Sequence, residues 1–115
     1  MPGGELVPMS YLIVLTTMPD IDSAQRLANG LVENSMAACV NILPEMLSIY
    51  TWKGERQQGS EHQLIIKTCA NQYENVEKWI KNEHPYELPE ILAIPIQNGL
   101  SEYLAWVNEN CGTQE

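Results

Sequence analysis

The sequence predicts an α+β domain with the element order β-α-β-β-α-β, followed by one further short helix. Two observations carry this prediction. Short apolar runs rich in β-branched residues are typical of strands, and between them lie two longer segments whose apolar residues recur at helical spacing. Proline, glycine, asparagine and aspartate stand at the junctions, where they end one element and begin the next.

The first strand and the first helix occupy residues 11–34. "YLIVLTT", residues 11–17, is typical of a buried strand, and "MPD" ends it. Asp20 is a suitable N-cap, and Asp22 lies in the first turn, where the helix dipole favours negative charge. The apolar residues that follow keep helical spacing, so this helix is predicted to run to about Asn34.

A second strand and a long hairpin are predicted next. "MAACVNIL", residues 36–43, forms the strand, and Pro44 indicates a bulge or an edge position. Residues 45–70 are predicted to form the hairpin, because apolar Leu47 and Ile49 alternate with Ser48, Tyr50 and Trp52. We place Gly54 and Gly59 in its turn region.

The second helix and the last strand follow. Asn71 and Glu74 have the spacing of a capping box, and the helix must stop at His84, because Pro85 forces its predecessor out of the helical conformation. "EILAIPI", residues 90–96, is the fourth core strand, and Pro95 marks an edge. Asn98-Gly99 is a turn, and residues 101–110 form a short helix.

This order predicts a ferredoxin-like split β-α-β fold, since right-handed crossovers place all four strands in one sheet and both long helices on one face. We expect a single domain over residues 10–115, preceded by a flexible N-terminal arm, residues 1–9. Two long helices cover one face only, so partner chains are predicted to cover the other. Trp79 belongs to the core, whereas Trp52 and Trp106 are candidates for an interface.

The composition excludes several classes of protein. The formal net charge of −9 in 115 residues argues against nucleic-acid binding, which requires clustered Lys and Arg. The chain start lacks a basic segment, and its longest apolar run is five residues, so we expect no signal peptide, no membrane insertion and a cytoplasmic location. Sequence motifs for common hydrolases, nucleotide-binding folds and zinc enzymes are absent, so we expect no enzyme activity.

Two residues are candidate metal ligands. His84, with Glu83 beside it, is a candidate metal ligand or proton carrier; alternatively, it is a helix C-terminal histidine that interacts with the dipole and terminal carbonyls. Cys39 follows two alanines at a strand start. It is either a small buried hydrophobe or a ligand for a soft metal.

Lys67 stands in "LIIKTCA", an otherwise apolar strand. Either its stem packs while its ammonium group reaches water, or it meets a carboxylate or phosphate in a cleft between chains. Glu90, at the start of the last strand, is its candidate partner.

The segments "VLTTMPD", "ENSMAACVNILP", "SIYTWKGE", "LIIKT", "HPYELPEILAIPI" and "YLAWV", in this order and spacing, resemble the CutA family of divalent-cation tolerance proteins. The resemblance covers about residues 11–108. It implies a ferredoxin-like subunit and a tight homotrimer in which strands extend across subunit boundaries, with an architecture related to PII signalling trimers. It also implies a link to tolerance of copper and other divalent metals.

The metal ligands of these relatives are present at some positions of this sequence and absent at others. Some bacterial relatives are described as binding copper through a first-strand cysteine and a His-His pair; these fall on Thr16, Glu83 and His84, so only His84 matches. A second-helix cysteine of those relatives falls on Trp79. Cys39 matches the family's "AAC". We therefore expect a weakly bound Cu²⁺ or other divalent cation at His84, Glu83 and Cys39, and no organic cofactor.

Six further residues match positions that line or border the intersubunit clefts of the family: Tyr50, Trp52, Lys67, Tyr86, Glu90 and Trp106. The sequence therefore predicts a trimeric protein of copper tolerance or signalling. Two alternatives stay open. One is a PII-like sensor that binds a small anionic metabolite in the cleft through Lys67, and the other is a protein-interaction scaffold without a small ligand.

Overall fold

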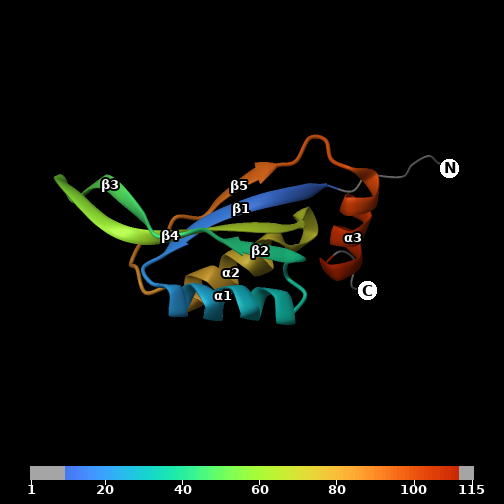
Figure 1. Ribbon diagram of the computed structural model, residues 1–115, viewed down its shortest axis with the longest axis horizontal. Helices are drawn as coiled ribbons and strands as arrows, with labels where there is room; N and C mark the ends of the chain where they lie inside the picture. Colours follow the sequence, from blue (N-terminus) through green and yellow to red (C-terminus); the bar gives the residue numbers. More distant parts are fainter. Residues whose placement is uncertain (1–9, 112–115) are drawn as a thin grey trace.

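The computed structural model describes residues 10–111; the predicted flexible arm, residues 1–9, lies outside this range, as do residues 112–115. The elements are β1 Tyr11–Met18, α1 Ile21–Glu33, β2 Cys39–Ile42, β3 Met46–Trp52, β4 Glu55–Cys69, a 3₁₀ turn Ala70–Gln72, α2 Tyr73–Glu83, β5 Leu92–Pro95 and α3 Ser101–Cys111 (Figure 1). The helices and strands follow the predicted sequence of segments, but three strands (β2, β3 and β4) separate α1 from α2 where the order β-α-β-β-α-β has two, and a 3₁₀ turn precedes α2. Within the described part, no helix is long and apolar enough to cross a membrane.

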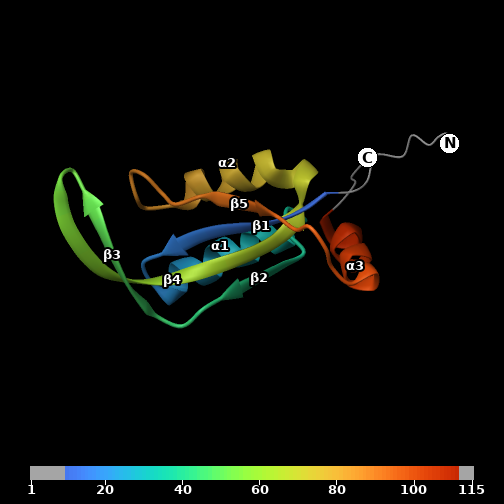
Figure 2. The same cartoon turned by 90° about the horizontal axis from the view of Figure 1, so that it is seen from above.

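The strands form an antiparallel sheet in the order β2-β4-β1-β5. The carboxyl-terminal half of β4 pairs with both β1 and β2, whereas its first half pairs with β3 and forms a projecting arm. Figures 1 and 2 show α1 and α2 together on one face of the sheet, with α3 at the end opposite the arm. Residues 10–111 therefore form a mixed α/β fold with three α-helices.

The core lies between α1, α2 and one face of the sheet. Asp20 caps α1 as predicted, since its side chain accepts a hydrogen bond of 2.8 Å from the backbone N–H of Ser23. The fully buried side chains of this core include Val14, Leu27, Leu31, Leu64, Ile66, Val76 and Ile80. Trp79 is partly buried against this cluster. The apolar stripes of both helices thus meet the predicted strands.

Two local predictions are wrong. The hairpin turns at Lys53-Gly54, where both residues have positive φ (52° and 84°), as in a tight two-residue turn. Gly59 lies instead within β4, opposite Ser48. At α2, Asn71 lies inside the preceding 3₁₀ turn, and the N-cap position falls on Gln72, whose side chain makes no capping hydrogen bond. The extra turn moves the start of α2 beyond the predicted capping box.

The sheet face away from α1 and α2 is largely open. Leu92 and Ile94 are 55% and 47% exposed, and they stand beside Leu15 and Ile13 on that face. The molecule measures 55 × 27 × 24 Å, and its radius of gyration is 15.8 Å. A compact domain of this length has a radius of about 13 Å. The excess reflects the β3–β4 arm, which projects from the body (Figure 2).

Replacing Gly30 of α1 by Ala should destabilise the fold, because the added methyl would overlap the indole ring of Trp79 on α2. Overpacking of this kind costs about 1–3 kcal/mol of unfolding free energy. Gly59→Ala is the matched control, since a methyl there meets no atom within 4 Å. Urea denaturation of both variants tests the contact, and equal stability of the two would refute it.

Candidate functional site

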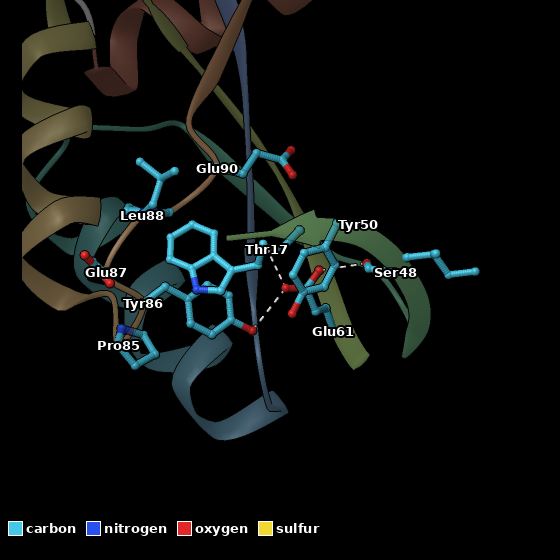
Figure 3. Close-up of a pocket in the computed structure, with 12 residues that line it drawn as sticks. Thr17, Ser48, Tyr50, Glu61, Pro85, Tyr86, Glu87, Leu88 and Glu90 are labelled. Atoms are coloured by element: carbon cyan, nitrogen blue, oxygen red, sulfur yellow. Dashed lines mark hydrogen bonds between the residues drawn. The ribbon is translucent and has the colours of Figure 1, made fainter. Parts of the chain in front are cut away.

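A groove of about 750 Å³ lies between the β3–β4 arm and the segment that follows α2 (Figure 3). Its walls hold three aromatic rings, Tyr50, Trp52 and Tyr86, and three carboxylates, Glu61, Glu87 and Glu90. The other lining residues are Thr17, Ser48, Ile49, Pro85, Leu88 and Pro89. None of these twelve residues is Lys or Arg, so the groove carries negative charge without a fixed cation of its own.

Glu61 is the centre of the groove, because three hydroxyl groups converge on its carboxylate. Oε2 accepts hydrogen bonds from Thr17 Oγ1 (3.2 Å) and from the Tyr86 hydroxyl (3.0 Å), while Oε1 accepts one from Ser48 Oγ (2.7 Å). Figure 3 shows these side chains pointing toward one another. One side chain of β4 thus joins β1, β3 and the segment after α2.

His84 fixes that segment to the sheet. It ends α2 in an extended conformation (φ −84°, ψ 137°), as Pro85 requires, and its ring is buried. Nε2 lies 2.6 Å from the carbonyl oxygen of Thr17, and Nδ1 accepts a hydrogen bond of 3.1 Å from the backbone N–H of Tyr86. The ring must therefore donate from Nε2, so it is a neutral imidazole with both nitrogens engaged.

Gln63 connects the groove to the edge of the sheet. Its side-chain amide donates to the carbonyl oxygen of Thr16 at 2.8 Å and to Glu90 Oε2 at 3.5 Å. This orients Glu90 toward the same end of the groove as Thr17. The carboxylate of Glu90 is consequently held from β4, two residues beyond Glu61.

The electrostatics of the groove keep Tyr86 protonated. Burial, followed by the hydrogen bond to Glu61 and the nearby charge of that carboxylate, raises the pKa of Tyr86 from 10.0 to about 12. A phenolate beside a carboxylate would be repelled and poorly solvated, so the neutral donor is the stable form. Tyr86 therefore acts as a hydrogen-bond donor to Glu61 throughout the physiological pH range.

The structure brings together four of the six predicted cleft residues, Tyr50, Trp52, Tyr86 and Glu90, in this groove. Lys67 and Trp106 do not line it. Lys67 lies at the α3 end of β4, with Nζ 5.9 Å from the Tyr103 ring, and Trp106 packs on the same ring at 5.4 Å between centroids. The predicted pairing of Lys67 with Glu90 is therefore not seen within one chain.

The three predicted metal ligands do not form a common site in one chain. Both nitrogens of His84 are engaged, Glu83 is exposed at the end of α2, and the thiol of Cys39 faces the side-chain oxygen of Asn41 at 4.0 Å. Across residues 10–111, no three His, Cys, Asp or Glu side chains are grouped so that they could hold a metal ion. The donor set within one chain thus does not fit directly coordinated copper.

Sequence analysis missed Glu61, Thr17 and Ser48. The signal for Glu61 and Ser48 lies in the register of the hairpin: a two-residue turn at Lys53-Gly54 sets Ser48 opposite Gly59 and Met46 opposite Glu61. Thr17 joins them through the pairing of β1 with β4, which sets it opposite Gln63. Alternation then places Ser48 on the same side of the arm as Tyr50. Our placement of Gly59 in the turn concealed this register.

Comparison with known proteins identifies a matching family. The family model described as "CutA1 divalent ion tolerance protein" matches residues 12–110, a range that includes every residue lining the groove. The divalent-cation tolerance protein CutA of Pectobacterium atrosepticum is 43% identical over 97 residues, which cover 84% of this chain and 88% of that protein.

Solved structures agree with the sequence comparison. The divalent cation tolerance protein of Thermus thermophilus superposes with a TM-score of 0.86 at 43% identity, covering 89% of this chain and 99% of that chain. The CutA of Archaeoglobus fulgidus, described as periplasmic, superposes with a TM-score of 0.85 at 36% identity, covering 88% of this chain and 98% of that chain. The similarity therefore extends over nearly the whole fold.

The raised pKa of Tyr86 predicts a specific alkaline titration. An unfolded tyrosine loses its proton near pH 10.0, whereas folded Tyr86 keeps it to about pH 12. Its contribution to stability is thus complete below about pH 10 and is lost as the pH rises from about 10 to about 12. Tyrosinate absorbance should lose its highest-pH component in Tyr86→Phe. A difference titration centred near pH 10.0, the unshifted value, would contradict the hydrogen bond to Glu61.

Proposed function

The chain belongs to the CutA1 family of divalent ion tolerance proteins, and from this premise we propose that it acts in divalent-cation tolerance as a non-catalytic binding protein whose recognition site is the groove around Glu61. One observation supports this above the others: the carboxylate of Glu61 is held by three neutral hydroxyl groups in a groove lined by further carboxylates. Its charge is oriented but not neutralised, so the groove favours a positively charged ligand.

The ligand that this proposal favours is a hydrated divalent cation, bound weakly. The absence of a three-ligand cluster across the described residues argues against a stripped ion such as tightly coordinated copper. Divalent ions that keep several of their waters need only one or two carboxylates. Glu61 supplies such a carboxylate, and Glu87 and Glu90 lie along the same groove. Copper binding through His84, Glu83 and Cys39 is the competing proposal.

We also propose that the working unit is a homotrimer of ferredoxin-like subunits with PII-related architecture. The sheet order β2-β4-β1-β5, with α1 and α2 on one face, supports the ferredoxin-like assignment. The open face and the arm support association: Leu47 and Ile49 on the arm are 60% and 62% exposed, in addition to Leu92 and Ile94. Apolar surface of this extent is typical of an interface.

A PII-like sensor of a small anionic metabolite is the second candidate, favoured by the position of Lys67. The side chain of Lys67 is half-buried near Tyr103, and the same residue lines a small apolar pocket of about 170 Å³ beside α3. In one chain this ammonium group does not reach the groove, so such a site needs a second chain to combine Lys67 with the groove. A ligand-free scaffold and a cytoplasmic location also stay predictions.

Titration with Mg²⁺, Mn²⁺ and Cu²⁺, followed by tryptophan fluorescence, to which Trp52 of the groove contributes, tests the groove as a cation site. Glu61→Gln keeps the shape and removes the charge, and it should weaken binding of Mg²⁺ and Mn²⁺ about tenfold, equivalent to about 1.4 kcal/mol. Glu109→Gln, on the exposed side of α3, is the charge-matched control and should bind as wild type.

The same titration separates the competing copper site. If Cu²⁺ affinity falls in Cys39→Ser and His84→Ala while Glu61→Gln binds every ion as tightly as wild type, the metal uses the sequence-predicted ligands and the groove proposal is wrong.

Sedimentation analysis tests the trimer independently of any ligand. We expect a species of three times the 13.0 kDa chain mass. Ile49→Glu should shift it toward single chains, because a charge replaces apolar area on the arm, while Glu55→Gln, at the exposed arm tip, should leave it intact. A wild-type protein that sediments as one chain at micromolar concentration would exclude the proposed assembly.

A further inference from the structure

A pair of thiols lies at the end of the sheet opposite the arm. Cys69 is the last residue of β4 and Cys111 the last of α3; they are 42 positions apart in sequence, yet their sulfur atoms lie 3.3 Å apart. Both side chains are fully buried, in a small cluster with Ala38, Val107 and Tyr11. Two unlinked thiols in direct contact are one oxidation step from a covalent bond between the helix and the sheet.

The third cysteine is set apart from this pair by its surroundings. Cys39 is half-buried at the start of β2, and its thiol faces Asn41. Cys111, by contrast, is held within reach of Cys69 by further hydrogen bonds: its thiol contacts the carbonyl oxygen of Val107 at 3.2 Å, and Thr68 Oγ1 lies 3.7 Å from its sulfur. The local structure therefore directs one particular pairing among the three cysteines.

A bond between these two cysteines would change how firmly α3 is attached to the sheet. Within α3, all of which the structure describes, the buried side chains are Val107 and Cys111. The helix nevertheless forms one wall of the small pocket beside Lys67, through Tyr103, Leu104 and Val107. A covalent bond at Cys111 would fasten the end of a lightly held helix and so fix that wall.

We propose that Cys69 and Cys111 form a site of reversible oxidation, at which an intrachain disulfide fastens α3 to the end of the sheet. The oxidant is a low-molecular-weight disulfide. One cysteine thiolate attacks it, forming a mixed disulfide and releasing one small thiol. The second cysteine then attacks the protein sulfur of the mixed disulfide and releases the other. Each cysteine gives up one proton, and two electrons pass to the two released thiols.

The burial of the pair sets the conditions for this reaction. Burial, together with the hydrogen bond to Cys111, raises the pKa of the Cys69 thiol to about 12. Thiolate is scarce while α3 is packed, so attack occurs when the last turn of α3 opens. Burial also favours disulfide formation over the binding of a soft metal ion. A disulfide is neutral, whereas two thiolates bound to a monovalent ion would leave a net charge in an apolar cluster.

The experiment exposes the reduced full-length protein to oxidised glutathione and follows intact mass, peptide maps and thermal unfolding. We expect the loss of two hydrogen atoms, a Cys69–Cys111 cross-linked peptide, and a rise in Tm on the order of 10 °C that a reductant reverses. Cys39→Ser is the matched control and should oxidise as wild type does. Cys111→Ser should form no intrachain disulfide and should show no Tm rise.

Several results would overturn the proposal. Three free thiols after prolonged oxidation of the wild type, a cross-link that includes Cys39, a cross-link between chains, or an unchanged Tm in the cross-linked protein would each do so. Uptake of one Ag⁺ per chain that Cys69→Ser abolishes, without disulfide formation in glutathione, would assign the pair to soft-metal binding instead. The wild-type peptide map decides between these results even if a cysteine variant fails to fold.

Discussion

The structure depends on one strand that joins the body of the sheet to the arm. β4 is 15 residues long; its second half is the central strand between β1 and β2, and its first half pairs with β3 in the arm. Because side chains alternate along a strand, Glu61, Gln63, Lys67 and Cys69 all stand on the face turned away from α1 and α2. The alternation of side chains along β4 therefore sets the positions of Glu61 in the groove, of Lys67 and of Cys69 in the thiol pair.

The carboxylate of Glu61 shows how polarity is accommodated at the junction of body and arm. A charged group that leaves water must recover its hydrogen bonds, and here three hydroxyl donors from three different segments supply them. Neutral donors satisfy the oxygen atoms without cancelling the charge. The segment that carries Tyr86 is in turn held by His84, so a histidine that resembles a metal ligand in sequence serves here to position a hydrogen-bond donor.

Sequence reasoning recovered the elements whose signals are local. Asp20 caps α1 and Pro85 ends α2, because each acts on the backbone within a few residues. It did not recover the contacts of Glu61 with Thr17 or of Cys69 with Cys111, which join residues 44 and 42 positions apart. Those contacts follow from the pairing of β1 with β4 and from the docking of α3, which no local pattern encodes. The separation of Lys67 from Glu90 has a similar origin: Lys67 pairs with Ile13, which pairs with Ile94, four residues beyond Glu90.

The open face of the sheet connects the groove with the region under α3. Ile13, Leu15, Leu92 and Ile94 occupy the part of the sheet between Thr17, at the groove, and Tyr11, under α3. Any chain that covers this apolar strip must approach both the carboxylates and the helix. A ligand that favours the covered form would strengthen association, and association would raise the affinity for that ligand by the same factor. In the assembly proposed above, association and ligand recognition would thus be linked through the geometry of one sheet face.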